Sequence, residues 1–240
     1  MLGDENPPLA LRGRKSTSVA LEYLSDLQLR PGAAGLDNAL PNADNDLLAF
    51  TRRAMLSARA TADVLDDVAK KTAPGQGLAY PATQLAGRLQ SIAQLIKMEL
   101  PTPVYYTIQS GYDTHAVQLP TQARLLGELA AGMKAFLDDL KQARLDDRVT
   151  MLCFSEFGRR VKENASLGTD HGTAGLVFVA GGNINAGLVG RPPALTDLVD
   201  DDLEVQIDFR QIYASLLRDW LGMDAAAVLG DSYEGLQLTK

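Results

Sequence analysis

The sequence predicts an α/β fold, in which apolar strands alternate with amphipathic helices. The clearest strand is the unbroken apolar run at residues 149–154, because a run that is apolar on both side-chain faces is typical of a buried central strand. Residues 103–109 are rich in β-branched and aromatic side chains, and residues 176–180 form another short apolar run. A helical pattern at about 120–143 joins the first two strands in the chain. We expect this strand–helix–strand unit to be parallel and right-handed.

Two further helices are predicted before the first strand, at about 46–71 and 82–100, because apolar residues recur there every three or four positions. Together they predict a helical hairpin over residues 44–100 that packs on the body of the protein. Residues 1–43 are rich in Pro, Gly, Asn and Asp, which indicates an irregular arm. We therefore expect an N-terminal arm followed by a single α/β domain over residues 44–240.

The last helix is predicted at about residues 209–221. Asp208 stands at its expected N-cap and Gln211 follows three residues later, which is the spacing of a capping box. The apolar stripe of this helix consists of Ile212, Tyr213, Leu216, Trp220 and Leu221.

Composition excludes several classes of protein. The 240 residues are 46% hydrophobic and 22% charged, which is typical of a globular protein. A net charge of -7 argues against general nucleic-acid binding, which needs clustered Lys and Arg. No apolar run reaches the roughly 18 residues that a membrane span needs, and the first residues lack the apolar core of a signal peptide. Cys153, the single cysteine, lies in an apolar run and is expected to pack in the core.

Acidic residues and both histidines gather in three loops of the predicted fold. Asp113 with His115 follows the first strand, Glu156 follows the central strand, and Asp170 with His171 precedes the next strand. Because parallel strands bring such loops to one sheet edge, we expect Asp113, His115, Glu156 and His171 to converge. Converging carboxylates repel one another without a cation between them. Asp and His suit Zn, Mn or Fe, and carboxylates also suit Mg or Ca, so the sequence predicts a divalent metal site.

Each of these residues also has a simpler interpretation. Asp-x-His is common by chance, and single Asp or His residues in loops often serve as caps. Arg159 and Arg160 could form a fork that binds a tetrahedral phosphate or sulfate, or could be a solvated helix start. The hydroxyls of Ser155, Thr114 and Thr169 could be nucleophiles, but caps explain them equally well, so no nucleophile is assigned.

At these residues the chain resembles a known family. The family is a large bacterial group of sulfatase-like proteins, catalogued as a domain of unknown function, and many members carry a twin-arginine export signal. It belongs to the alkaline phosphatase superfamily, together with phosphatases, sulfatases and cofactor-independent phosphoglycerate mutases. The matching motifs, within about 101–229, are Gly111-Tyr112-Asp113-Thr114-His115, Ser155-Glu156-Phe157-Gly158-Arg159-Arg160, Glu163-Asn164, Gly168-Thr169-Asp170-His171-Gly172, Asp208-Phe209-Arg210-x-x-Tyr213 and Trp220-Leu221-Gly222.

The resemblance implies a three-layer α/β/α sandwich of the alkaline phosphatase type with a bimetal centre. Asp113 and His115 resemble the ligand pair of one metal, Glu156 the acidic ligand at the end of a strand, and His171 a later histidine ligand. Asp170 is then either a ligand or the support that orients one. The chain differs from the family pattern because its start shows neither an opening strand nor a Gly-Gly-x-Asp segment. We therefore expect it to lack the usual N-terminal strand and to correspond to the carboxyl-terminal part of a full-length member.

The leading functional prediction is a metal-dependent hydrolase of phosphate or sulfate esters with a partial site, acting on a small anionic ester with Zn, Mn, Mg or Ca. The alternative is a non-catalytic binding or structural protein that retains the fold. A helical adaptor is a third class, suggested only by the predicted long helices. The resemblance also implies that full-length members are exported to the periplasm.

Overall fold

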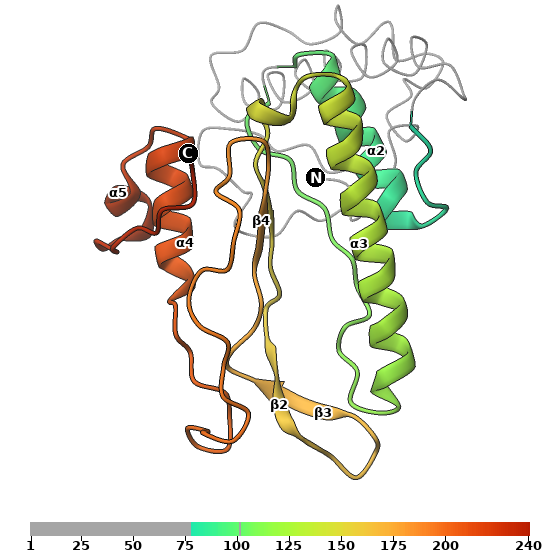
Figure 1. The fold of residues 1–240 in the computed structure, drawn as a ribbon, viewed down its shortest axis with the longest axis vertical. Helices are drawn as coiled ribbons and strands as arrows, with labels where there is room; N and C mark the ends of the chain where they lie inside the picture. Colours follow the sequence, from blue (N-terminus) through green and yellow to red (C-terminus); the bar gives the residue numbers. More distant parts are fainter. Residues whose placement is uncertain (1–77, 101) are drawn as a thin grey trace, which may run out of the picture. The chain divides into compact units, whose positions relative to one another are not determined.

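The computed structural model describes residues 78–100 and 102–240 (Figure 1). The predicted arm at 1–43 and the predicted helix at 46–71 lie outside this part of the chain. The described residues divide into two compact units. The first contains residues up to 110 together with 127–139, and the second contains 111–126 and 140–240.

In the described part of the first unit, α2 (Gln84–Lys97) lies beside the carboxyl-terminal half of α3 (Gln118–Gln142) (Figure 1). These helices confirm the predictions at 82–100 and 120–143. The hydroxyl oxygen of Thr83 caps α2 by accepting a hydrogen bond from the Ala86 amide at 3.2 Å. Gly132 of α3 lies at the contact with α2, where an added β carbon would still have ordinary van der Waals space. A β carbon there would lie 3.5 Å from a methyl group of Leu89. The apolar face of α2 is buried at Leu85, Ala86, Leu89, Ile92, Ala93 and Leu95.

A buried carboxylate adds polar contacts to this unit. Asp139 is 5% exposed, and it accepts hydrogen bonds from the Tyr80 hydroxyl at 3.0 Å and the Lys97 ammonium group at 2.5 Å. Burial, together with the charge of Asp139, raises the pKa of Tyr80 far above its usual value. The hydroxyl therefore stays protonated and keeps donating to the carboxylate. This satisfies the charge of Asp139, which would be costly to bury without partners.

The prediction of a continuous strand at 103–109 is wrong. Only Thr107 in this range takes part in a β-bridge. The β-branched and aromatic composition expresses a preference for extended backbone, but a strand also needs a neighbour along its length. No such ladder involves residues 103–109 in the described part of the chain.

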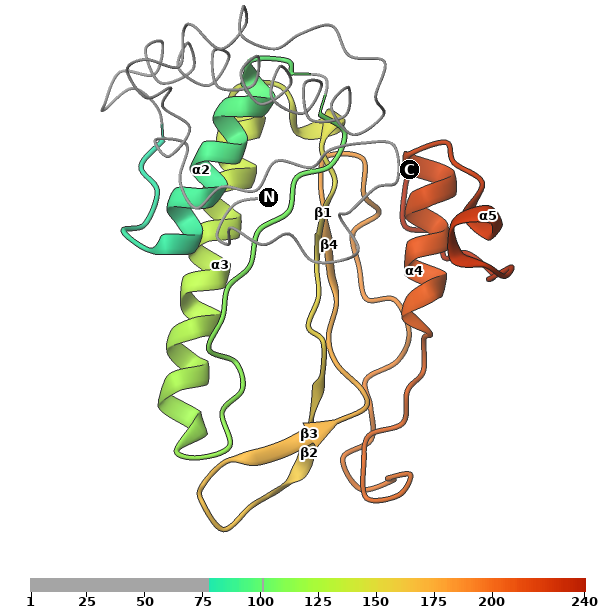
Figure 2. The same ribbon diagram turned by 180° about the vertical axis from the view of Figure 1, so that it is seen from behind.

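The second unit contains the predicted central strand in a shortened form. β1 (Met151–Cys153) pairs with β4 (Phe178–Ala180), which confirms that both apolar runs contain strands (Figure 2). The pairing is antiparallel and joins Met151 to Ala180. The parallel strand–helix–strand unit expected from 103–109 and 149–154 is not formed among the described residues, because they contain no strand at 103–109. A parallel pair needs a crossover connection, usually a helix, whereas the chain between β1 and β4 contains a further strand pair.

That further pair is a hairpin of β2 (Gly158–Glu163) and β3 (Thr169–Gly172), which the sequence analysis did not predict. Arg159 lies opposite His171 in its register. Asn164 holds the turn, because its side-chain oxygen accepts hydrogen bonds from the amides of Ser166 and Gly168 at 2.9 and 3.1 Å. The sequence signal for this turn was Asn164 followed by Gly168, since Asn favours such local side-chain bonds.

The carboxyl-terminal helices begin with α4 (Phe209–Ser215), continue through a π-helical turn, η5 (Leu216–Trp220), and end with α5 (Ala225–Leu229). The capping box of Asp208 and Gln211 is formed as predicted. Ser215 is almost completely buried. Its hydroxyl donates to the Gln211 carbonyl and accepts from the Leu236 amide at 2.6 Å. This side chain therefore attaches the final segment to α4.

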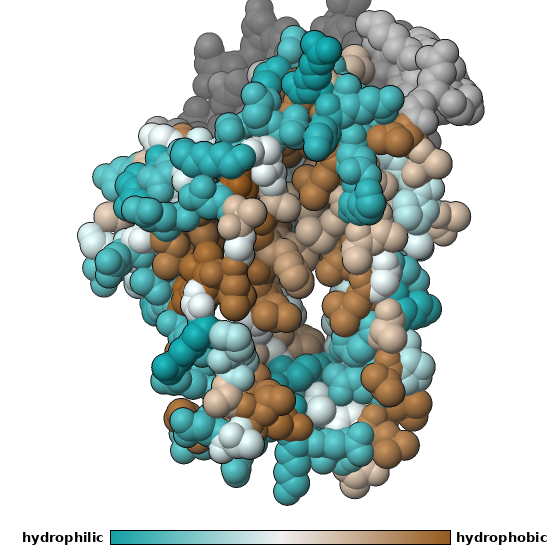
Figure 3. Space-filling model, viewed as in Figure 1, coloured by the Kyte–Doolittle hydropathy of each residue, from teal (hydrophilic) through white to brown (hydrophobic). Residues whose placement is uncertain are grey.

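Aromatic contacts connect the end of β1 with α4. The ring of Phe154 meets Tyr213 edge-on at a centroid distance of 6.3 Å, and Phe209 meets Tyr213 in the same way at 5.5 Å. Figure 3 shows hydrophobic residues gathered on the face where α4 and β4 lie. Helices and short strands together confirm an α/β protein in the general sense. No helix in the described residues is both long and apolar enough to cross a membrane.

The Asp208 cap leads to a pH-dependent prediction. Hydrogen bonds from the Arg210 side chain and amide lower the pKa of Asp208 to about 2. A carboxyl whose pKa is depressed on folding stabilises the fold above its unfolded pKa of about 3.9, and this stabilisation is lost as the pH falls through the folded pKa. Asp208→Asn keeps a capping oxygen but removes the charge. We expect the variant to unfold at a lower urea concentration than the parent at pH 6, and the difference to shrink between about pH 4 and pH 2. A difference that stays constant over this range would contradict the assignment.

Candidate metal centre

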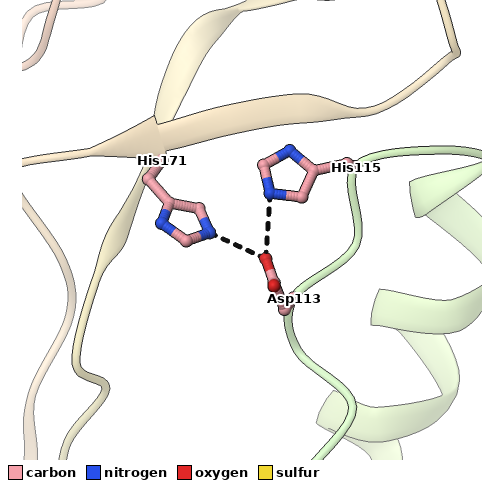
Figure 4. A group of neighbouring side chains, drawn as sticks. All are labelled: Asp113, His115 and His171. Carbon is pink, nitrogen blue, oxygen red and sulfur yellow. Dashed lines mark hydrogen bonds and ion pairs between the residues drawn. The ribbon is translucent and has the colours of Figure 1, made fainter.

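Three of the predicted ligands converge in the second unit. Asp113 Oδ1 lies 2.7 Å from His171 Nε2 and 3.0 Å from His115 Nε2 (Figure 4). One ligand atom from each residue lies within 4.8 Å of the others. The side chains of Asp113, His115 and His171 are 63%, 49% and 45% exposed. The cluster is therefore open to solvent and joins a loop to strand β3.

The loop that carries Asp113 is shaped by local hydrogen bonds and by the start of α3. Gln122 on α3 donates from its side-chain nitrogen to the Tyr112 carbonyl at 3.2 Å and to the Thr114 hydroxyl at 3.0 Å. The Thr114 amide also donates to the Tyr112 carbonyl at 2.9 Å. Gly111 takes a left-handed conformation with φ of 100°, which glycine adopts without steric cost. Both residues that flank Asp113 are therefore held in place.

The turn of the β2–β3 hairpin attaches directly to the segment that follows His115. The amides of Val117 and Gln118 donate to the carbonyls of Ser166 and Leu167 at 3.0 and 2.9 Å. Asn164 donates from its side chain to the His115 carbonyl at 3.0 Å. These bonds hold the histidine of the loop beside the strand that carries the second histidine.

Ring stacking orients His171. The Phe157 ring lies parallel to the His171 ring, with 3.8 Å between centroids and 5° between planes. The two histidine rings are also stacked, at 5.0 Å and 26°. The guanidinium of Arg159 lies 5.0 Å from the Phe157 ring centroid on a cation–π contact. Phe157 was not predicted to belong to the site. Its only signal in the sequence was an aromatic residue within the Ser155–Arg160 motif.

The charges around Asp113 favour its ionised form. The hydrogen bond with His171 lowers the pKa of Asp113 most. Desolvation opposes this shift, and the charges of His115, His171 and Arg159 add to the lowering. The carboxylate is thus available as an anionic ligand or as an acceptor for both imidazoles.

The other predicted ligands lie at or outside the edge of this cluster. Asp170 Oδ1 lies 3.5 Å from His115 Nδ1, on the opposite ring nitrogen from the one that faces Asp113. Asn164 also donates to Asp170 Oδ1 at 3.4 Å. Glu156 is exposed in the bend between β1 and β2 and does not belong to the group that the described residues form.

The structure does not join the two arginines in one fork. Arg159 and Arg160 are neighbours on β2, where successive side chains point to opposite faces. Arg159 faces the cluster and donates from Nη1 to the Thr169 carbonyl at 2.6 Å. Arg160 contributes instead to the charge environment of Asp202. Burial acts to raise the pKa of Asp202, but hydrogen bonds from Thr173 and Leu203, with the charge of Arg160, outweigh it and lower the pKa.

The candidate hydroxyls are largely occupied. The Thr114 side chain accepts from Gln122, and the residue is 9% exposed. The Thr169 hydroxyl donates to the Gln118 side chain at 2.9 Å. Ser155 is exposed between β1 and β2. The geometry thus ties Thr114 and Thr169 to the scaffold and leaves the nucleophile unassigned.

Gly168 controls how closely the hairpin approaches the loop. A β carbon at Gly168 would lie 2.4 Å from both the carbonyl carbon and the carbonyl oxygen of His115. We expect Gly168→Ala to destabilise the protein by about 1–3 kcal/mol, because backbone must move to relieve the overlap. Urea unfolding would measure the change. Gly87→Ala is the matched control, because a β carbon there meets nothing within 4 Å. Equal unfolding midpoints for Gly168→Ala and the parent would disprove the close approach.

Comparison with known proteins identifies a family and gives no further relative. No curated protein and no solved structure matches the chain. A family model described as "Protein of unknown function (DUF1501)" matches residues 15–235. The match covers most of the 240 residues. The chain therefore belongs to the DUF1501 family.

Proposed function

We propose that this protein is a metal-dependent hydrolase of phosphate or sulfate esters, with a partial site in this chain. The observation that carries the proposal is the convergence of Asp113, His115 and His171. Two imidazoles and one carboxylate, all reachable by solvent, form an N₂O donor set with room for further ligands. The resemblance to sulfatase-like proteins supplies the reaction class. The motif residues that carry the resemblance include these three side chains.

The side chains fit a divalent ion in chemistry and in spacing. Metal–ligand bonds to His and Asp are about 2.0–2.2 Å long, so ligands on opposite sides of an ion lie about 4 Å apart. The ligand atoms of Asp113, His115 and His171 lie within 4.8 Å of one another, so small side-chain rotations suffice. The same contacts also allow a metal-free hydrogen-bonded cluster.

Each residue would have a distinct part in such a site. Asp113 supplies the negative charge, and His115 and His171 supply neutral ring nitrogens. Asp170 is suited to orient His115, because it approaches Nδ1 and leaves Nε2 toward Asp113. A bound divalent ion would supply Lewis acidity toward an ester oxygen. The exposed position of the cluster would let a small anionic ester reach it.

The broader expectations belong to the same proposal. A three-layer α/β/α sandwich of the alkaline phosphatase type is supported by the motif order and by the general α/β character of the chain. Glu156 remains a proposed part of the site through this resemblance, whereas Arg159 and Arg160, which do not form one fork, are not carried over as an anion site. Export to the periplasm is proposed from the twin-arginine signals of similar proteins.

A non-catalytic metal-binding protein is the second candidate. It is favoured by the side-chain bonds of Thr114 and Thr169, which tie both hydroxyls to α3. The described cluster also offers three ligands, enough for one well-held ion. A two-metal hydrolase needs both ions and an aligned nucleophile. Bound metal without ester turnover would support this second candidate.

We expect His171→Ala to weaken Zn²⁺ binding far more than it lowers stability. The variant loses one of three ligands, but its side chain is 45% exposed and little apolar area is lost. We expect the Zn²⁺ affinity to fall at least about tenfold. Losing a residue that only orients a metal ligand typically costs about 10–100-fold, and His171 would itself be a ligand. Elemental analysis and a chelator titration, beside a thermal melt, would measure both effects. Lys162→Ala on the same hairpin is the control. Unfolding of His171→Ala with unchanged metal content would show that the histidine is structural.

We expect ester hydrolysis by this chain to be weak or absent. Aryl phosphate and aryl sulfate would be assayed with added Zn, Mn, Mg or Ca, and we expect kcat below the range of about 1–10³ s⁻¹ that is typical of enzymes. The reason is that the Thr114 and Thr169 hydroxyls are bonded to side chains of α3, and that the described residues offer one cluster of ligands. Metal-dependent turnover within that range, lost in Glu156→Ala, would show instead that the site is complete.

A further inference from the structure

The guanidinium of Arg159 is enclosed by oxygen atoms of the protein itself. Nη1 donates to the Thr169 carbonyl at 2.6 Å, and Nη2 donates to the Tyr112 carbonyl and to the Thr114 hydroxyl at 3.4 Å. Its side chain is only 19% exposed, whereas the nearby Asp113 side chain is 63% exposed. A charged group in this position directs its donors into the scaffold rather than into solvent.

These acceptors flank the candidate ligands on both sides of the cluster. Tyr112 and Thr114 immediately precede and follow Asp113 in the chain. Thr169 lies two residues before His171 on β3, and Arg159 itself is the register partner of His171. One side chain therefore joins the Tyr112 carbonyl and the Thr114 hydroxyl, on either side of Asp113, to the strand that carries His171.

Phe157 couples the same arginine to the orientation of the His171 ring. The Phe157 ring contacts both groups, with its centroid 5.0 Å from the Arg159 guanidinium carbon and 3.8 Å from the His171 ring centroid. Displacing the guanidinium would remove one of the contacts that hold the Phe157 ring flat against His171. Arg159 thus influences both the position of β3 and the rotation of one candidate ligand.

An anion-binding role competes with this arrangement for the same donors. A guanidinium binds phosphate or sulfate by presenting paired N–H groups to the anion. In Arg159 both terminal nitrogens already donate to main-chain carbonyls on opposite sides of the cluster. These bonds use three of the five N–H groups, so an anion held by both terminal nitrogens would compete with the carbonyls for the same guanidinium.

We infer that Arg159 is a positioning residue that aligns Asp113 with His171, rather than a residue that binds the substrate anion. The inference rests on the proposed metal site. Removing Arg159 would separate the loop from β3 and weaken metal binding, although it would also remove the ion pair between its Nη2 and Asp113 Oδ1 at 3.9 Å. Arg160, on the opposite face of β2, would have no such effect. Arg159→Lys keeps the positive charge and so tests the alignment by itself.

Zn²⁺ binding to the full chain provides the main test. We would compare Arg159→Met and Arg159→Lys with Arg160→Met, which removes the same charge one residue away. Competition with a chromophoric chelator would give the Zn²⁺ Kd, and a thermal melt in EDTA would report stability. We expect Arg159→Met to raise the Kd by about 10–100-fold, the usual effect of losing a partner that orients metal ligands. Arg159→Lys should resemble it, because an ammonium group lacks the planar fork that joins two separate carbonyls. Arg160→Met should stay within about twofold of the parent, since this surface charge makes no contact with the ligands.

Two binding results would overturn the inference. One is an equal Zn²⁺ Kd for Arg159→Met, Arg160→Met and the parent. The other is an Arg159→Met protein that keeps its Zn²⁺ Kd but no longer binds inorganic phosphate, which would make Arg159 an anion ligand. If Arg159→Met does not fold, Arg159→Lys carries the same comparison.

A metal-free measurement separates this inference from the proposed function. The chain has two histidines, so the imidazole region of its NMR spectrum contains two ring systems. With EDTA present, we expect a nuclear Overhauser contact between the His115 and His171 rings, whose centroids are 5.0 Å apart, in the parent and in Arg160→Met. Folded Arg159→Met or Arg159→Lys should lose it. A parent that shows this contact but binds no Zn²⁺ would refute the metal site alone. Persistence of the contact in the Arg159 variants would refute the positioning role.

Discussion

Attachment of the 112–118 segment to the β2–β3 hairpin is the constraint on which the cluster depends. Asp113 and His115 belong to the segment, His171 belongs to the hairpin, and neither element carries a complete donor set. Backbone bonds from Val117 and Gln118 to the hairpin turn fix one end of the contact. The Arg159 guanidinium joins the segment to β3 near the other end. The hairpin was absent from the sequence prediction, although it creates the arrangement that the predicted residues adopt.

Local patterns predicted the helices well and the strand pairing poorly. The 3.6-residue periodicity located α2 and α3, and the Asp208 capping box is a contact between near neighbours. Pairing of strands depends instead on residues far apart in the chain, so composition at 103–109 could not supply a partner strand. The π-helical turn η5 shows a subtler limit. It shifts the phase of the helix, so a regular stripe drawn from Ile212 to Leu221 does not describe one continuous α-helix.

The histidines of the cluster were predictable because the chain has two, each close to an aspartate. The predictions for Glu156 and for the paired arginines assumed a strand geometry that differs from the one in the structure. The run from Gly158 to Glu163 forms a strand rather than a helix start, so Arg159 and Arg160 diverge. The contacts of Phe157 depend on the same hairpin, and no spacing rule in the sequence identifies them.

The hydrogen bonds of Arg159 limit which amino acid substitutions preserve the alignment of the two elements. Two of its acceptors, at Tyr112 and Thr169, are main-chain carbonyls, and every amino acid carries such a group. Replacing either side chain would leave these two hydrogen bonds chemically possible. The donor is different, because no other side chain offers a planar fork with several N–H groups. The alignment of the two elements therefore constrains the amino acid at position 159 more tightly than the amino acids that it contacts.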